Sequence, residues 1–189
     1  MISSILLAAG QSKRMNGENK LTKKIKGLPL INHSIKNILN SSIDEIIIVL
    51  GHEKEIIEKF IDKDKKIKLV FNKNFDNGMA SSIKVGLDHL SRNTEVFFIC
   101  LGDMPEVKPN IYNKLVENKN NNKIVVPIYN NMQGNPVLFP MSMKKEIMQL
   151  DGDVGAKEVL NKNHDKILNL KINDEGIIKN YNTLDSFNI

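Results

Sequence analysis

Short runs of aliphatic residues recur along the first two thirds of the chain, each bounded by polar or turn-forming residues. Runs this short and rich in Ile, Val and Leu are typical of strands that are buried on both faces of a parallel sheet. We therefore predict strands over residues 2–8, 45–50, 68–71, 96–101 and 123–128.

The segments between these runs carry apolar residues at helical spacing. Within residues 30–39, Ile31, Ile35 and Ile38 fall on one helical face. The same pattern predicts further helices over residues 53–61, 79–90 and 109–117, the last with a proline in its first turn. Strands that alternate with helices predict an α/β fold with a mostly parallel central sheet and helices on both faces.

The alternation ends after residue 128. There we expect a turn over 129–134, a short strand over 135–139, helices over 141–150 and 154–160, and a closing hairpin of 167–172 with 177–181. The chain has no internal repeat, linker or low-complexity segment, so we expect residues 1–189 to form a single domain. In open sheets of this kind, ligands bind at the carboxyl ends of the strands.

The composition excludes several function classes. The 27 Lys and Arg residues against 22 Asp and Glu residues give a formal charge of +5, which suits an anionic ligand. The basic residues are scattered and aromatic residues make up only 5% of the chain, so we expect no nucleic-acid partner. No run approaches the ~20 apolar residues of a membrane span, and residues 1–9 read as a core strand and not as a signal peptide. We therefore expect no membrane partner.

The cysteine and histidine residues point away from disulfide and zinc chemistry. The single cysteine, Cys100, lies inside an apolar run, which fits a buried side chain and a reducing cytoplasm. The four histidines lack the spacing of a zinc site, and the chain lacks the Gly-x-Ser-x-Gly sequence of acyl-enzyme hydrolases. We expect a cytoplasmic protein that is monomeric or weakly self-associating.

A loop of small and basic residues follows the first predicted strand. It spans residues 8–15, with the sequence AAGQSKRM, and Lys20 comes shortly after it. Small residues let backbone amides approach a ligand, while Arg14 and Lys20 supply positive charge, so the pattern predicts a cradle for a triphosphate. The loop is neither a Gly-Lys-Ser/Thr phosphate loop nor a GxGxxG motif. A flexible loop with incidental basic residues is the alternative interpretation.

The run LLAAGQSKRM, followed by KL, resembles the signature of the MobA-like nucleotidyltransferases, and more closely their molybdopterin cytidylyltransferase branch. The resemblance implies a three-layer, Rossmann-like fold of the nucleotide-diphospho-sugar-transferase type. It implies that Arg14 and Lys20 are catalytic and neutralise the triphosphate. It also implies that the nucleotide lies against Leu7, Ala8, Ala9, Gly10 and Ser12. Guanylyl-transferring relatives usually carry Gly where Ala9 stands, so Ala9 favours CTP.

A carboxylate follows the fourth predicted strand, in the sequence Leu101-Gly102-Asp103-Met104-Pro105. A carboxylate at the carboxyl end of a strand can hold Mg²⁺ against phosphate oxygens. By itself, Gly-Asp-x-Pro is also an ordinary turn. In the family this position carries the metal-binding carboxylate, so the resemblance implies that Asp103 is catalytic and binds Mg²⁺ or Mn²⁺.

The chain departs from the family near its end. Relatives often carry an Asp-x-Asp stretch whose second acid joins the metal, whereas this chain has Asn182 at that place. The resemblance makes Asn182 a second metal ligand through its amide oxygen. Because an amide carries no charge, we expect weaker metal retention than two carboxylates give.

Another segment follows the family's nucleotide-binding pattern. Asn72, Gly78, Ser81 and Ser82 surround the start of a predicted helix, whose amides and hydroxyl groups are expected to bind the base or ribose. Plain capping of the helix by Ser81 or Ser82 is the alternative.

Two later segments resemble the acceptor-binding parts of the family. Gly134, Asn135 and Pro136 are expected to form a lip over the acceptor, with Asn135 in place of the commoner His. In the second segment, Asp153 is expected to cap the helix that follows it, and Lys157 to reach a phosphate as a point charge where Arg is frequent.

The resemblance implies Mg²⁺-dependent transfer of CMP from CTP to a phosphorylated acceptor, molybdopterin in this branch, with release of pyrophosphate. Two alternatives stay open. One is a sibling enzyme that uses a sugar phosphate or alcohol phosphate as acceptor. The other is a non-catalytic nucleotide- or cofactor-binding protein with the same fold.

Overall fold

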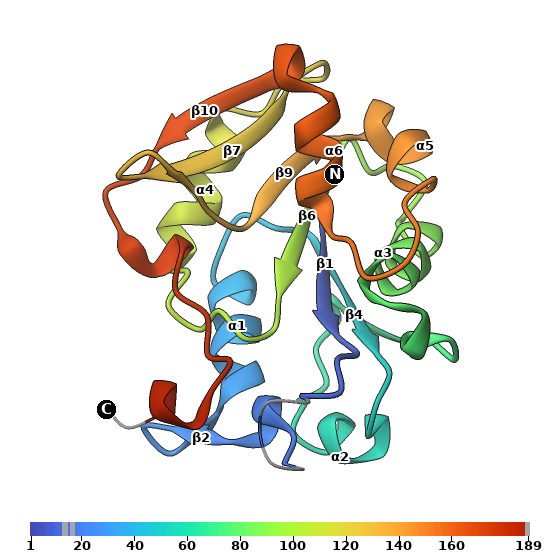
Figure 1. Ribbon diagram of the computed structural model, residues 1–189, viewed down its shortest axis with the longest axis vertical. Helices are drawn as coiled ribbons and strands as arrows, with labels where there is room; N and C mark the ends of the chain where they lie inside the picture. Colours follow the sequence, from blue (N-terminus) through green and yellow to red (C-terminus); the bar gives the residue numbers. More distant parts are fainter. Residues whose placement is uncertain (13–14, 16–17, 188–189) are drawn as a thin grey trace.

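A single large sheet forms the centre of the computed structural model, which describes residues 1–12, 15 and 18–187 (Figure 1). Its strand order is β10-β7-β9-β6-β1-β4-β5. The strands are β1 (Ile2–Ala8), β4 (Glu45–Leu50), β5 (Ile67–Phe71), β6 (Val96–Leu101), β7 (Ile124–Tyr129), β9 (Val137–Pro140) and β10 (Ile167–Lys171). Along this path only β9 runs against the others, between β6 and β7, so the prediction of a mostly parallel sheet is confirmed.

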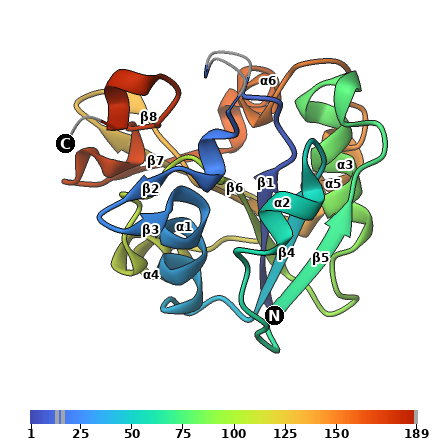
Figure 2. The ribbon, with the colours of Figure 1, turned by 90° about the horizontal axis from the view of Figure 1, so that it is seen from below.

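Helices cover both faces of the sheet, as predicted. Helices α1 (Leu30–Leu39) and α4 (Pro109–Glu117) lie on one face, whereas α3 (Met79–Asp88), α5 (Lys144–Ile147) and α6 (Ala156–Lys162) lie on the other (Figures 1 and 2). The short α2 (Lys54–Glu58) packs with the first group through Ile57. The chain therefore forms three layers, and among the described ranges no helix is long and apolar enough to cross a membrane.

The aliphatic runs form strands because they are covered on both sides. Ile47 and Phe97 lie in the core beneath α3, while their neighbours Ile48 and Phe98 lie in the core beneath α1 and α4. All four side chains have no exposed surface. Successive strand residues point to opposite faces, so an uninterrupted apolar run is what a sheet between two helical layers requires.

Two smaller pairings complete the sheet structure. β8 (Met132–Gln133) turns back on β7 through a tight turn in which Asn130 and Asn131 both have positive φ. β2 (Lys24–Ile25) and β3 (Leu28–Pro29) form a separate two-stranded ribbon just before α1. Beyond residue 128, β8 thus pairs locally with β7 and β10 pairs at the sheet edge, whereas β9 lies inside the sheet between β6 and β7.

The predicted closing hairpin is wrong. Strand β10 pairs in parallel with β7, and the residues after it form the 3-10 helix η5 (Glu175–Ile177) and then an irregular segment. That segment bonds to distant loops: Ile177 O accepts from Asn135 N at 2.8 Å, and Tyr181 N donates to Asp103 O at 3.0 Å. In Figure 1 this tail, drawn in red, descends from β10 to the lower edge, where β1, β4 and β6 end.

The predicted helix over 141–150 is also shorter than expected. The 3-10 helix η3 (Met141–Met143) leads into α5, which stops at Ile147. The helix expected over 53–61 is likewise reduced to α2. In both places one or two helical turns are enough to bury an isoleucine in the core, Ile57 in α2 and Ile147 in α5.

Candidate functional site

A cleft of about 790 Å³ opens at the carboxyl ends of β1 and β6, the edge seen from below in Figure 2. The loops that follow these strands line it together with segments that are distant in sequence. The described residues that line it are 7–12, 20–21, 75–79, 82, 101–103, 152–153, 180 and 182. The position agrees with the rule that ligands bind outside the carboxyl ends of parallel strands.

Three polar side chains meet on the wall of this cleft. Lys20 Nζ donates one hydrogen bond to Asp103 Oδ2 at 2.5 Å and another to Asn182 Oδ1 at 2.7 Å. Asp103 is only 8% exposed, so its carboxylate needs a partner, and the ammonium group of Lys20 provides it. Because one ammonium group reaches both oxygens, the oxygens of Asp103 and Asn182 converge on a single point.

Local structure fixes the backbone of Lys20. Ser12 has a positive φ of 52°, and its Oγ accepts a hydrogen bond from Lys20 N at 3.1 Å. Asn19 Oδ1 accepts from Leu21 N and so caps the 3-10 helix η1 (Lys20–Thr22), while the side chain of Leu21 is buried. Arg14, predicted to share the phosphate-binding role, lies outside the described residues.

The start of α3 packs tightly against a later loop. Gly78 has φ of 90°, and a Cβ there would lie 2.4 Å from the carbonyl group of Gly152, so a side chain has no room. Met79 N donates to Asp153 Oδ1 at 3.2 Å, and Ala80 N donates to Gly152 O at 3.2 Å. Two of the helix-start amides that were expected to face the nucleotide are therefore bonded to protein.

The predicted capping role of Asp153 needs correction. Its carboxylate binds the amino end of α3, whereas α6 begins after Gly155 without a side-chain cap. Asp153 is close in sequence to α6, but the fold brings its carboxylate to α3, a helix that comes much earlier in the sequence. Asp153 still lines the cleft, so it remains beside any ligand there.

Asn72 and Ser81 lie behind the cleft wall and brace it. Asn72 Nδ2 donates to Ser81 Oγ at 2.8 Å and to Ser82 Oγ at 3.0 Å. Asn72 Oδ1 accepts from Asn74 N at 2.9 Å, so the asparagine joins the end of β5 to the first turn of α3. Of these residues only Ser82 lines the cleft, together with Gly78 and the predicted residues Leu7, Ala8, Ala9, Gly10 and Ser12.

The predicted acceptor residues are spread more widely. Gly134, Asn135 and Pro136 lie just before β9, joined by a cis Asn135–Pro136 peptide bond, and are not part of the cleft lining. They stay close to the same sheet edge, because Val137 pairs with Ile99 near the end of β6. Lys157 is exposed on α6 and also lies outside the lining.

The cleft residues between β5 and α3 were not predicted from the sequence. Phe75, Asp76 and Asn77 form the 3-10 helix η2 and line the cleft, and Gln11 donates a hydrogen bond to Asp76 from the facing loop. The sequence did contain a signal for them: two polar residues stand directly before a glycine that opens a helix, at the carboxyl edge of the sheet.

The tail reaches the cleft through a buried tyrosine. Tyr181 is 5% exposed, and its hydroxyl donates to Glu106 Oε1 at 2.8 Å. Burial, together with the nearby carboxylate of Glu106, raises the pKa of Tyr181 to about 12. The next residue, Asn182, is thereby carried to the wall that holds Asp103.

The oxygens of Asp103 and Asn182 suit one hard divalent cation. Over residues 1–12, 15 and 18–187 no group of three or more His, Cys, Asp or Glu side chains is placed to hold a metal. Mg²⁺ is commonly held by one or two protein oxygens, with substrate phosphates and water completing its shell. In this structure the positively charged ammonium group of Lys20 lies between the oxygens of Asp103 and Asn182. The residues therefore fit a cation that binds together with a phosphate.

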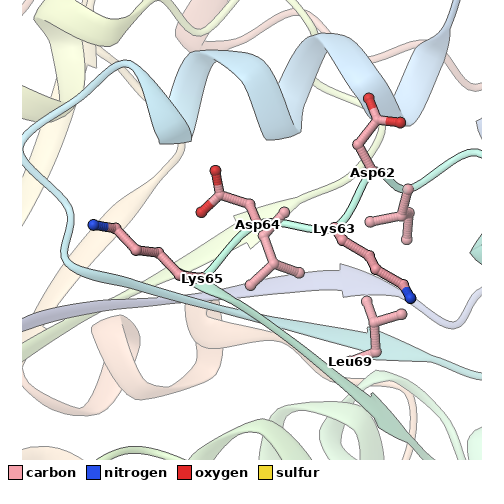
Figure 3. A pocket seen from close by; sticks show the side chains of 7 residues that line it. Asp62, Lys63, Asp64, Lys65 and Leu69 are labelled. Atoms are coloured by element: carbon pink, nitrogen blue, oxygen red, sulfur yellow. The ribbon is translucent and has the colours of Figure 1, made fainter.

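A second hollow of about 260 Å³ lies at residues 61–69, near the amino end of β5 and away from the cleft (Figure 3). The side chains of Asp62, Lys63, Asp64 and Lys65 point in different directions there. Alternating charges that do not converge form no phosphate or metal site, so we assign the functional site to the larger cleft.

Comparison with known proteins gives the cleft a context. Residues 4–167 match the family model described as MobA-like NTP transferase domain. The bifunctional protein GlmU of Thermosipho africanus is 30% identical over 162 residues, which cover 85% of this chain and 35% of that protein. This chain thus spans about a third of the length of GlmU.

Two relatives of more similar length carry molybdenum cofactor names. The probable molybdenum cofactor guanylyltransferase of Methanosarcina acetivorans is 27% identical over 155 residues, or 79% of this chain and 67% of that protein. The molybdenum cofactor cytidylyltransferase of Escherichia coli K12 is 26% identical over 159 residues, or 84% of this chain and 80% of that protein. The family resemblance inferred from the sequence is confirmed.

Solved structures share the fold. The crystal structure of Rv0371c from Mycobacterium tuberculosis H37Rv superposes with a TM-score of 0.87 at 21% identity, covering 98% of this chain and 95% of that one. The same protein in complex with manganese gives a TM-score of 0.77 at 20% identity, covering 91% and 88%. The predicted three-layer, Rossmann-like fold of the nucleotide-diphospho-sugar-transferase type is confirmed.

Proposed function

Because the chain belongs to the MobA-like NTP transferase domain family, a family of nucleotidyltransferases, we propose that it transfers CMP from CTP to the phosphate of molybdopterin and releases pyrophosphate, with Mg²⁺ as cofactor. The observation that carries the proposal is the convergence of Lys20, Asp103 and Asn182 on the wall of the cleft. A volume of about 790 Å³ falls in the range of ~300–1,000 Å³ that is usual for ligand pockets.

In the proposed reaction the chain positions phosphates and neutralises their charge. An acceptor phosphate attacks the α-phosphorus in line with the departing pyrophosphate, and this nucleophile is ionised near neutral pH without a general base. Lys20 bonds to the oxygens of the triphosphate, where charge grows as pyrophosphate leaves. The small residues Ala8, Ala9 and Gly10 let the loop backbone approach the nucleotide.

Asp103 and Asn182 are the residues that hold the cation in this proposal. Mg²⁺, when bound, supplies Lewis-acid stabilisation of negative charge on phosphate oxygens. Asp103 contributes the charge of the site, and Asn182 contributes a neutral oxygen that helps to fix the cation's position. The manganese complex of Rv0371c supports a divalent cation on this fold.

Ala9 and the cytidylyltransferase of E. coli support CTP as the donor. Ala9 lines the cleft at the position where guanylyl-transferring relatives usually carry Gly. The similar identity of the Methanosarcina guanylyltransferase makes GTP the rival donor.

A thermal-shift panel tests the donor. CTP, GTP, ATP and UTP are each added with and without Mg²⁺, because a ligand that binds only the native state stabilises it, by about 2.7 kcal/mol at a hundred times its Kd. We expect the largest shift with CTP and Mg²⁺ together. A larger shift with GTP than with CTP would make GTP the donor, and no shift with any nucleotide would reject the proposal.

A sugar phosphate or alcohol phosphate is the second candidate acceptor. The observation in its favour is that Asn135 stands where the family more often has His, outside the lining of the cleft. Pyrophosphate release at saturating CTP and Mg²⁺ is measured with molybdopterin, a hexose 1-phosphate and a polyol phosphate. Release with molybdopterin alone supports the first proposal. Release with none of the three acceptors favours a non-catalytic nucleotide-binding role.

A further inference from the structure

The turn that carries Asp103 also holds the tail that carries Asn182. Within the turn, Asp103 O accepts from Tyr181 N at 3.0 Å, and three residues later Glu106 Oε1 accepts from the Tyr181 hydroxyl at 2.8 Å. Lys108 adds an ion pair with Asp174 in the tail, with Nζ and Oδ2 2.7 Å apart. We call the set of Glu106, Lys108, Asp174, Lys179 and Tyr181 the tail clasp.

The two segments fit closely along their length. A Cβ on Gly176 would lie 2.4 Å from Glu106 O, so the tail backbone lies directly on the turn at this point. Lys179 Nζ lies 3.6 Å from Glu106 Oε2 and 2.5 Å from Glu175 Oε1. The turn and the tail therefore meet at several successive points and not only at the cleft.

Within the clasp, the bond between Tyr181 and Glu106 contributes most. The side chains of Lys108 and Lys179 are 62% and 43% exposed, and ion pairs of such exposed groups contribute little. The Tyr181 ring is buried and packs edge-on against Phe187, with centroids 5.5 Å apart. Its hydroxyl donates to an ionised acceptor, and such hydrogen bonds are stronger than neutral ones.

Asn182 depends on this support more than a carboxylate would. It lies outside any helix or strand, so no regular hydrogen-bond ladder holds its backbone. An amide oxygen carries no net charge that would draw it to a cation, whereas the carboxylate of Asp103 does. A neutral ligand has to be held in place beforehand by its neighbours.

We propose that Glu106 is a positioning residue that acts through Tyr181 to hold Asn182 beside Asp103, so that both oxygens bind one divalent cation. This inference rests on the metal-binding part of the proposed function. Glu106 does not line the cleft, so its effect on the cation passes through the tail.

The first test measures the position of the tail without any ligand. Amide hydrogen exchange is followed by NMR at Tyr181, whose N–H bonds to Asp103 O, and at Leu6 in the central strand β1 as a core reference. Loss of a hydrogen bond to a charged group predicts exchange about tenfold faster or more at Tyr181 in Glu106→Ala, with Leu6 unchanged. An unchanged rate at Tyr181 would overturn the inference.

Two matched variants isolate the contact. Glu106→Gln keeps an oxygen that can accept from the tyrosine hydroxyl, and we expect it to restore slow exchange at Tyr181. Glu175→Ala removes the other carboxylate that binds Lys179 but leaves the contact between Tyr181 and Glu106. In this variant the Tyr181 amide should therefore also exchange slowly. Fast exchange in Glu175→Ala, equal to that in Glu106→Ala, would assign the effect to Lys179 instead.

The second test measures the affinity for Mn²⁺ without nucleotide, from the concentration of free Mn²⁺ given by electron paramagnetic resonance. Residues that orient a metal ligand typically change affinity by 10–100-fold, so we expect about a tenfold weaker Kd in Glu106→Ala, Tyr181→Phe and Asn182→Ala. If Glu106 acts through Asn182, the double variant Glu106→Ala/Asn182→Ala binds no more weakly than either single variant. Additive losses would contradict this route.

Asp103→Ala separates this inference from the proposed function. Mn²⁺ affinity that is unchanged in Asp103→Ala would reject the metal site, and the role of Glu106 with it. A large loss in Asp103→Ala, combined with none in Glu106→Ala, would reject only the role of Glu106.

Discussion

Lys20 and Asp103 form an ion pair at the wall of the cleft, with Nζ and Oδ2 2.5 Å apart and both side chains less than one fifth exposed. Each residue neutralises the other in a place that water reaches poorly. A substitution of either one therefore has two effects, one on ligand binding and one on the charge that is left behind.

Replacement of Asp103 by Ala should abolish metal-dependent turnover while the fold persists. Removal of one preorganised charge-stabilising group typically lowers kcat by about 100-fold or more. Pyrophosphate release gives kcat, and circular dichroism checks the fold. Asp64→Ala, in the hollow of residues 61–69, serves as the control and should keep wild-type turnover. Turnover near the wild-type rate in Asp103→Ala would show that the metal assignment is wrong.

Replacement of Lys20 by Met should separate phosphate binding from metal binding. Met keeps a long side chain but has no ammonium group between the oxygens of Asp103 and Asn182. We expect nucleotide affinity to fall, and stability without ligand to fall by about 1–3 kcal/mol because the Asp103 carboxylate loses its partner. Mg²⁺ alone should then raise the thermal midpoint of the variant more than that of the wild type. An equal response to Mg²⁺ in both proteins would contradict the shared position of ammonium and cation.

Replacement of Gly78 by Ala should destabilise the protein through two separable effects. Gly78 has φ of 90° and ψ of 178°, a conformation that costs a side chain about 1–3 kcal/mol, and the contact with Gly152 adds a steric clash. Gly27→Ala is the matched control, because Gly27 also has a positive φ but has no atom within 4 Å of the added Cβ. Urea unfolding should give a larger loss for Gly78→Ala, and equal losses would mean that the loop at Gly152 yields easily.

The tail should lose stability in acid through Asp174. The ion-paired hydrogen bond from Lys108, with a smaller contribution from the backbone N–H of Gly176, lowers the pKa of Asp174 below its ordinary value of 3.8. A lowered folded-state pKa means that the stabilisation is fully present above pH 3.8 and is lost as the pH falls through the folded-state value.

Comparison of Asp174→Ala with the wild type checks this dependence. Asp174 Oδ1 accepts from Gly176 N at 2.9 Å and so caps the start of η5. At neutral pH we expect the variant to be less stable by about 1 kcal/mol, as for loss of a capping side chain. The difference should shrink as both proteins are unfolded at successively lower pH. Asp62→Ala, which removes an exposed carboxylate, should give a smaller difference at neutral pH. A difference between Asp174→Ala and the wild type that stays constant down to pH values well below 3.8 would contradict the role of Asp174.

The strands at the centre of the sheet were predictable because their sequence and their environment agree. Residues such as Ile47 and Phe97 are apolar in runs that only a sheet covered on both faces can bury. Ile177 and Tyr181 misled the prediction, because spaced apolar residues near a turn also fit a hairpin. Their actual partners, Asn135 and Asp103, come from loops that follow other strands.

Several residues that line the cleft were predictable from the sequence, but the contacts that hold them in place were not. Lys20 and Asp103 each follow a buried strand, and the family signature marks both positions. Glu106 carries no such signature, since a carboxylate one residue after Pro105 is ordinary until a tyrosine of the tail reaches it. The partner of Asp153 was equally hidden, because its bond to Met79 depends on how two distant loops pack.

The contact between Lys20 and Asn182 joins residues that are 162 positions apart. During synthesis, the strands from β1 to β6 emerge long before Asn182, so the central pairings can form while the cleft still lacks one wall. Closing so long a loop costs entropy that the earlier pairings have already reduced by ordering the chain. The order of emergence from the ribosome therefore makes the contact between Lys20 and Asn182 form later than the pairings of the central strands.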